Sequence, residues 1–114
     1  MNWQIEYYAD KTGDEPVRDF INRQSLDAQA EIFHVIGLLQ EFALSLGQLY
    51  VKKIGKSGIR ELRIHHSSDN YRIFYFAFTG RRFILLHAFL KKTMKTPERE
   101  INMALKRMDD YKLR

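Results

Sequence analysis

Arginine and lysine side chains recur at positions where the surrounding sequence predicts β-strands. Arg60 and Arg63 lie in the run from Gly58 to Arg63, and Arg72 stands at the start of an aromatic run. A cation in so apolar a strand is costly unless it reaches an edge, a partner or a cleft. The planar guanidinium group matches the oxygens of a phosphate. These positions therefore indicate a surface that could hold a phosphate backbone.

Three lysines, Lys91, Lys92 and Lys95, follow the last predicted strand. All these cations also have a purely structural interpretation. Arg72 could form an ion pair with Glu61 on the neighbouring strand, and the lysines could belong to a solvated loop before a helix. The residues alone leave both interpretations open.

The formal net charge of +5 conceals an uneven distribution. Residues 1–51 hold eight acids and three bases, whereas residues 52–95 hold eleven bases and two acids, Glu61 and Asp69. The second segment therefore carries a charge of +9. A basic segment next to an acidic one favours a surface that faces a polyanion, and a solvated charged face is the alternative.

Several classes of chemistry lack the residues that they need. The chain has no cysteine, so disulfides, thiolate zinc sites and cysteine nucleophiles are excluded. It has neither a glycine-rich nucleotide-binding motif nor a nucleophile elbow. His65 and His66 are neighbours on a predicted strand and should point to opposite faces, which makes a poor joint metal site. We therefore expect no metal and no cofactor.

The first half of the chain predicts one strand and two helices. Residues 2–8 alternate between apolar and polar side chains, which is the period of a half-buried strand. Asp14 is predicted to cap a short helix. Ser25 is predicted to cap a longer helix that runs to about Leu46 and ends at Gly47.

The second half predicts a series of strands and a final helix. The expected strands cover residues 49–54, 59–66, 71–78 and 83–89. The third of these is almost wholly apolar and aromatic, so it should be covered on both faces. Thr96, followed by proline and glutamate, is expected to cap the last helix.

This order of elements predicts the α+β class. We expect a mainly antiparallel sheet, with two helices of the N-terminal half packed on one face and a C-terminal helix. The length predicts a single domain over residues 1–114. No apolar run approaches the roughly 20 residues of a membrane span, and the N-terminus lacks a signal-peptide pattern, so we expect a cytoplasmic protein without a membrane partner.

The combination of three motifs in the second half has a counterpart in a known family. These motifs are Gly58-Ile-Arg-Glu-Leu-Arg63, Tyr71-Arg-Ile-Phe-Tyr-Phe76 and Leu85-Leu-His-Ala-Phe-Leu-Lys-Lys-Thr93, with Lys95-Thr-Pro97 close behind. Over about residues 50–108 the chain resembles the phage Gp49-like, HigB-type branch of the RelE/ParE toxin superfamily. The resemblance implies a RelE-like fold and the toxin of a type II toxin–antitoxin pair. Such toxins cleave mRNA on the ribosome, and a HigA-like antitoxin neutralises them, binds DNA and assembles with them into an oligomer.

The resemblance also implies which cations act on RNA. In a metal-free ribonuclease, the ribose 2′-oxygen attacks its own phosphate and cations stabilise the charge that develops. Arg72 looks like the conserved strand arginine of the family, and Arg63 and Lys92 are the next best phosphate contacts. The further RNA-binding or ribosome-binding candidates are Arg60, Lys91, Lys95, Lys53 and Lys56.

The groups that transfer protons are harder to assign. A lysine among neighbouring cations could act as the base, and His87 is the other candidate because histidine titrates near neutral pH. His87 could equally be a satisfied core histidine. Many RelE-like enzymes use a C-terminal tyrosine, but Tyr111, the only tyrosine after Tyr75, lies far along the last predicted helix. The tyrosine role therefore cannot be mapped onto this chain.

Two other functions remain compatible with the sequence. The same superfamily contains ParE-like toxins, which inhibit DNA gyrase by binding it and perform no chemistry. A non-catalytic RNA-binding module is the second alternative, in which Tyr71 and Tyr75 would stack on bases. Core packing is the competing interpretation of these two tyrosines.

Overall fold

The computed structural model describes residues 3–114 and has the predicted order of elements. The elements are β1 (Gln4–Tyr7), α1 (Pro16–Asn22), α2 (Leu26–Phe42), the 3-10 turn η1 (Ala43–Ser45), β2 (Val51–Lys53), β3 (Arg60–His66), β4 (Asp69–Phe78), β5 (Arg82–Leu90) and α3 (Glu98–Lys112). Residue 2 of the predicted first strand lies outside the described residues. Within residues 3–114, none of the helices is both long and apolar enough to span a membrane.

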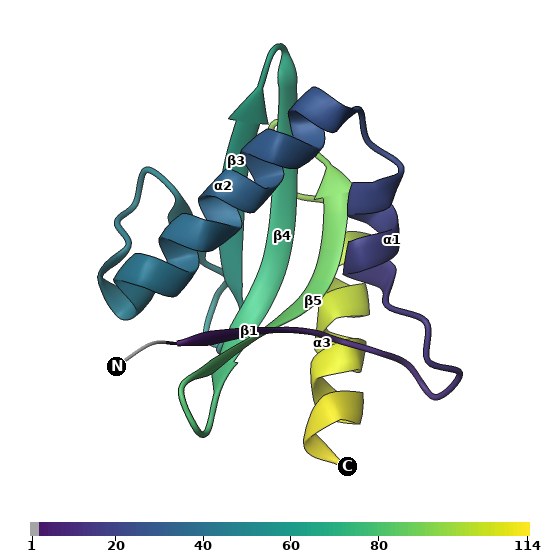
Figure 1. Cartoon of the computed structure of the whole chain (residues 1–114). Helices are drawn as coiled ribbons and strands as arrows, with labels where there is room; N and C mark the ends of the chain where they lie inside the picture. Colours follow the sequence, from purple (N-terminus) through teal and green to yellow (C-terminus); the bar gives the residue numbers. More distant parts are fainter. Residues whose placement is uncertain (1–2) are drawn as a thin grey trace.

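The five strands form one sheet in the order β1-β5-β4-β3-β2. The hairpins β2–β3, β3–β4 and β4–β5 are antiparallel, as the short predicted turns require. β1 pairs in parallel with β5, which brings the beginning of the chain beside its last strand (Figure 1). The two edges of the sheet are therefore β1 and β2, and β2 is only three residues long.

The three helices cover both faces of the sheet. α1 and α2 lie together on one face, toward the viewer in Figure 1, and bury their apolar sides against β3, β4 and β5. This placement confirms the prediction for the two helices of the N-terminal half. α3 packs on the opposite face, where Ala104 and Met108 contact a second cluster around Phe74 and Leu86. The side chains of β3 and β4 therefore alternate between an α1/α2 face and an α3 face.

The centre of β4 is buried on both faces, as its aromatic run predicts. All six residues from Tyr71 to Phe76 are buried. A bulge follows Phe74, which pairs with His87, while Tyr75 pairs with Leu85. The extra residue in β5 breaks the strict alternation. As a result, His87 lies on the α3 face of the sheet, where it bonds to that helix.

The start of α2 agrees with the prediction, but its end does not. The Ala28 amide donates to the Ser25 hydroxyl oxygen at 3.1 Å, which confirms Ser25 as the N-cap. The α-helix ends at Phe42, and the chain leaves it at Ala43 with a φ of 51°. Gly47 is therefore not the C-cap. The intervening 3-10 turn lets Leu46 pack against the main core.

The two other predicted caps are wrong. Glu15 occupies the N-cap position of α1, and Asp14 lies before it, where its backbone amide donates to the Asp10 carboxylate at 3.0 Å. α3 begins at Glu98 without a side-chain cap, because the Thr96 hydroxyl donates to a Glu61 carboxylate oxygen at 3.3 Å. The hydroxyl thus connects the β5–α3 loop to β3.

Candidate functional site

Five cations line two adjoining pockets along β2 and the start of β3. The larger pocket has a volume of about 680 Å³ and the smaller about 240 Å³, and both contain Lys53 and Arg60 in their walls. No acidic residue lines either pocket within the described chain. We call this surface the basic groove, and its cations are Lys52, Lys53, Lys56, Arg60 and Arg63.

The groove follows from the shortness of the edge strand β2. Lys52 pairs with Glu61 and Lys53 pairs with Arg60, so the two lysines project to opposite faces of a strand that has a neighbour on one side only. Both are exposed. The loop that follows carries Lys56, and it turns at glycines with φ values of +55° and +91°. Sequence reasoning named Lys53 and Lys56 but missed Lys52, although two adjacent lysines in so short a strand were a usable signal.

Arg72 is buried, with only 8% of its surface exposed. Its Nη1 donates to the Tyr71 carbonyl oxygen at 3.0 Å, and its Nε lies 3.7 Å from Oε2 of Glu61. The ion pair with Glu61 that the sequence offered as an alternative is therefore present. Burial lowers the pKa of the Arg72 guanidinium, and the Glu61 carboxylate opposes this shift. Arg72 Nε itself has no hydrogen-bond partner among the described residues.

Arg63 lies beside Arg72 and shares its acidic partner. The two arginines are register partners on β3 and β4, and they therefore project to the same face. Arg63 Nε lies 3.9 Å from Oε1 of Glu61. Arg63 also lines both the larger pocket of the basic groove and a further hollow of about 520 Å³ that Arg72 lines too. The arginine pair thus extends the line of positive charge from the groove toward the centre of the sheet.

The three lysines after β5 lie on the loop that leads into α3. The Lys91 amide donates to the Asn70 carbonyl oxygen at 2.7 Å, and its Nζ donates to the Met94 carbonyl oxygen at 2.8 Å. Lys92 and Lys95 are exposed. Because Thr96, at the end of this loop, bonds to the acidic partner of the arginine pair, the lysine loop is anchored to the same region of β3.

His87 connects β5 to α3 through both of its ring nitrogens. Nε2 lies 2.6 Å from the Glu100 carboxylate, and Nδ1 lies 3.0 Å from Nη1 of Arg107. Because an arginine can only donate, these partners assign a neutral ring that accepts at Nδ1 and donates at Nε2. Burial lowers the pKa of His87, the hydrogen bond to Glu100 raises it, and the Arg107 charge lowers it further.

His87 does not contact the arginine pair directly. The Phe89 side chain lies between them in the register, opposite Arg72 and stacked on the His87 ring with centroids 5.7 Å apart. The histidine is therefore a satisfied link between two elements, and neither ring nitrogen is free to take a proton without losing a bond.

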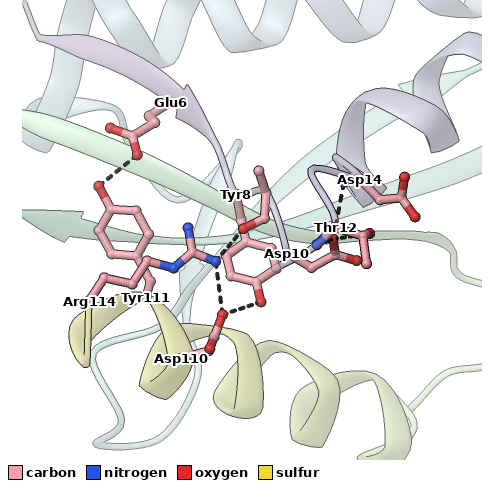
Figure 2. Close-up of polar contacts among 9 residues, drawn as sticks. Glu6, Tyr8, Asp10, Thr12, Asp14, Asp110, Tyr111 and Arg114 are labelled. Atoms are coloured by element: carbon pink, nitrogen blue, oxygen red, sulfur yellow. Dashed lines mark hydrogen bonds and ion pairs between the residues drawn. The ribbon is translucent and has the colours of Figure 1, made fainter.

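Tyr111 lies at the other edge of the sheet from the basic groove. Its hydroxyl donates to the Glu6 carboxylate at 2.6 Å and accepts from Nη1 of Arg82 at 3.1 Å. Figure 2 shows this hydroxyl pointing at Glu6 on the first strand, beside a second contact in which Tyr8 donates to Asp110 at 2.6 Å. Tyr111 therefore anchors the end of α3 to β1.

Tyr71 and Tyr75 are core residues and do not form a stacking platform. They are 4% and 1% exposed and belong to the cluster beneath α1 and α2. Burial raises the pKa of Tyr75 to about 12. The interpretation in which these two rings stack on bases is therefore wrong, because the core covers their faces.

In residues 3–114 there is no group of three or more histidine or acidic side chains placed to hold a metal ion.

Comparison with known proteins places the chain in one family. No curated protein matches the chain significantly. The family model described as "Phage derived protein Gp49-like" matches residues 19–109, which include the basic groove, the arginine pair with Glu61 and the lysine loop. Since this match spans well over half of the chain, the protein belongs to the phage-derived Gp49-like family, which is part of the RelE/HigB-like toxin group.

Proposed function

We propose that this protein is the toxin of a type II toxin–antitoxin pair and that it inhibits translation by cleaving mRNA on the ribosome. The observation that carries the proposal is the basic groove, whose two pockets are lined by no acidic residue of the described chain and which reaches the arginine pair through Arg63. Membership in a generally toxin-like family supports it.

The groove suits the sugar–phosphate backbone of a single strand. Each cation that neutralises a phosphate releases a counterion, which gives affinity without demanding a base sequence. Lys52, Lys53 and Lys56 are exposed and can follow the backbone, whereas Arg60 and Arg63 are half-buried and more fixed. An RNA strand lying along β2 would thus pass from exposed lysines to half-buried arginines.

The proposed cleavage uses no metal. The 2′-oxygen of one ribose attacks the adjacent phosphorus, its proton passes to a base, and the bond from phosphorus to the 5′-oxygen breaks. One product ends in a 2′,3′-cyclic phosphate, and the other begins with a 5′-hydroxyl that has gained a proton. The guanidinium groups of Arg63 and Arg72 and the ammonium group of Lys92 stabilise the extra negative charge on the phosphorane oxygens.

Proton transfer is assigned to the lysine loop and not to His87. Both nitrogens of His87 are engaged, by Glu100 and Arg107, and Phe89 separates the ring from Arg72. Lys95 is exposed on a loop that is tied to the arginine pair through Thr96, and as the base it leaves Lys92 as the ammonium group. A lysine among other cations can serve as a general base.

The proposal includes the partners that the toxin role requires. They are the ribosome with its mRNA, and a HigA-like antitoxin through which the complex binds DNA. An acidic segment of the antitoxin could cover the basic groove, because opposite charges across an interface steer and orient association. The cytoplasm is the proposed compartment, since translating ribosomes are found there.

The test incubates the purified protein with a defined mRNA, with and without translating ribosomes, and maps new ends by primer extension. We expect cuts only with ribosomes, and their loss in Arg63→Ala but not in the matched control Arg23→Ala, an exposed arginine after α1. Tight RNA binding with an intact message would instead support a non-catalytic RNA-binding module. An intact message with inhibition in a gyrase supercoiling assay would support a ParE-like inhibitor.

A further inference from the structure

We propose that Glu61 is a positioning residue of this cleavage site, which holds Arg63 and Arg72 in the orientation that receives the phosphate. This inference rests on the proposed function and deepens it. Glu61 and Asp69 are the only acids among residues 52–95, and Glu61 is the buried one. A carboxylate beside an anion-binding surface lowers the affinity of that surface for anions. Its presence is therefore explained best if it orients the cations that bind the anion.

The carboxylate of Glu61 is almost completely enclosed. It is 2% exposed, and a buried carboxylate is strongly unfavourable without partners. Its partners come from three segments. Oε1 faces Arg63 on β3, and Oε2 faces both Arg72 on β4 and the Thr96 hydroxyl on the loop before α3. One carboxylate therefore joins two strands and the lysine loop.

The distances leave the arginine donors available to a second acceptor. The Nε atoms of Arg63 and Arg72 lie 3.9 and 3.7 Å from the carboxylate oxygens, which is beyond hydrogen-bond distance. The attraction is therefore a charge–charge contact that orients the groups without saturating their N–H bonds. Arg72 Nε has no hydrogen-bond partner among the described residues. A buried donor of this kind is costly until an acceptor arrives, and a phosphate oxygen would supply one.

The net charge of Glu61, Arg63 and Arg72 also supports a positioning role. One carboxylate stands against two guanidinium groups, so the cluster keeps an excess of one positive charge. Glu61 also lies between Lys52 of the basic groove and Phe74 of the core in the strand register. It therefore stands where the groove meets the buried part of the sheet, and the excess charge faces a phosphate that follows the groove.

A positioning role and a merely structural role predict different results for Glu61→Gln. Glutamine keeps the size of the side chain and an oxygen for Thr96, but it removes the negative charge. If Glu61 positions the arginines, the surface becomes more positive and RNA binds as well or better, while cleavage slows because the arginines lose their orientation. If Glu61 only stabilises the fold, RNA affinity, cleavage and melting temperature all fall together.

The experiment compares Glu61→Gln with Glu41→Gln, which removes the same charge from an exposed position on α2. Single-turnover cleavage of ribosome-bound mRNA gives the rate constant. Affinity is measured with a message that carries a 2′-deoxy sugar at the cut and cannot react. We expect Glu61→Gln to slow cleavage about a hundredfold with unchanged or tighter binding, and Glu41→Gln to match the wild type. Glu61→Asp, which keeps the charge, should recover part of the rate.

A second readout does not depend on cleavage. In NMR spectra, the Nε–Hε signals of Arg63 and Arg72 should be dispersed in the wild type, and Glu61→Gln should move both toward the random-coil position. If the wild type cuts no message but these signals behave as expected, the proposed function fails and the positioning role stands. Wild-type cleavage by folded Glu61→Gln, or unchanged arginine signals, would overturn the inference. If Glu61→Gln does not fold, Glu61→Asp carries both measurements.

Discussion

Arg72 and Glu61, the two buried charged residues in the described part of the chain, are paired with one another across β4 and β3. Their Nε and Oε2 atoms lie 3.7 Å apart. A buried ion pair is a poor source of net stability, because desolvation offsets most of the attraction. An apolar pair would pack the same space at least as well. The pair therefore costs desolvation free energy that the fold alone does not require. In the proposed function, this cost is accepted because Arg72 is held in place to contact a phosphate.

The N-cap of α2 should be worth a measurable amount of stability. In Ser25→Ala the Ala28 amide loses its acceptor, which lies at 3.1 Å in the wild type. We expect the free energy of unfolding to fall by about 1 kcal/mol. Urea denaturation measures this change, with Ser68→Ala in an exposed turn as the control. Equal stability of the two variants would show that the hydroxyl does not cap the helix in solution.

Removing one groove cation should reduce the salt dependence of RNA binding. For single strands the slope of log K against log salt changes by about 0.7 for each phosphate contact. Lys52→Gln should therefore weaken binding of a non-cleavable RNA and flatten the slope by about that amount. Lys106→Gln, on α3 and outside the groove, is the control. A slope that responds to Lys106 and not to Lys52 would place the RNA on another surface.

The Tyr111 hydroxyl should matter for stability and not for cleavage. Tyr111→Phe removes the bond to Glu6 and the bond from Arg82 but keeps the ring between Phe76 and Phe78. We expect a loss of about 1 kcal/mol in thermal unfolding, because water reaches these half-buried partners. The cleavage rate on ribosomes should stay at the wild-type value. A large loss of rate in a folded Tyr111→Phe would give this tyrosine a chemical role after all.

The link between β5 and α3 should make stability depend on pH near neutrality. Burial, the largest influence, lowers the pKa of His87 below its ordinary value of 6.5. Just below that pH the unfolded chain binds a proton that the folded protein does not. The contribution of His87 to the free energy of unfolding should therefore have its full value above pH 6.5 and decrease as the pH falls below it.

His87→Gln should lack this component. Chemical denaturation of both proteins across this pH range gives the comparison, and the difference in stability between wild type and variant should shrink as the pH falls. A wild-type curve that rises on acidification would mean that Glu100, whose hydrogen bond favours the protonated ring, outweighs burial.

Features with a local cause could be predicted from the sequence. The aromatic run of β4 requires cover on both faces, and Ser25 is followed by a helical pattern, so a buried central strand and a capped helix follow without any knowledge of the fold. The cations at Arg63 and Arg72 were visible for the same reason, because a charge in an apolar strand needs an explanation. The ion pair with Glu61 was foreseen as one of two outcomes.

Features that depend on which segments meet could not be predicted. The parallel pairing of β1 with β5 joins segments about 78 residues apart, and no local pattern encodes it. No local pattern shows that α3 packs on the opposite face of the sheet. The same holds for the hydrogen bond from the Thr96 hydroxyl to Glu61, because it joins segments that are distant in the sequence. The bulge after Phe74, which turns His87 toward α3, is also invisible in a pattern of period two.

The most direct test of the account is the cleavage rate of Arg72→Lys. Lysine keeps a positive charge beside Glu61 but lacks the planar fork that matches phosphate oxygens. Single-turnover cleavage of ribosome-bound mRNA is compared among the wild type, Arg72→Lys and the control Arg82→Lys, whose arginine contacts Glu6 at the other edge of the sheet. We expect Arg72→Lys, shown to be folded, to be slower by about a hundredfold or more while binding non-cleavable RNA normally. Cleavage by Arg72→Lys at the wild-type rate would contradict the account.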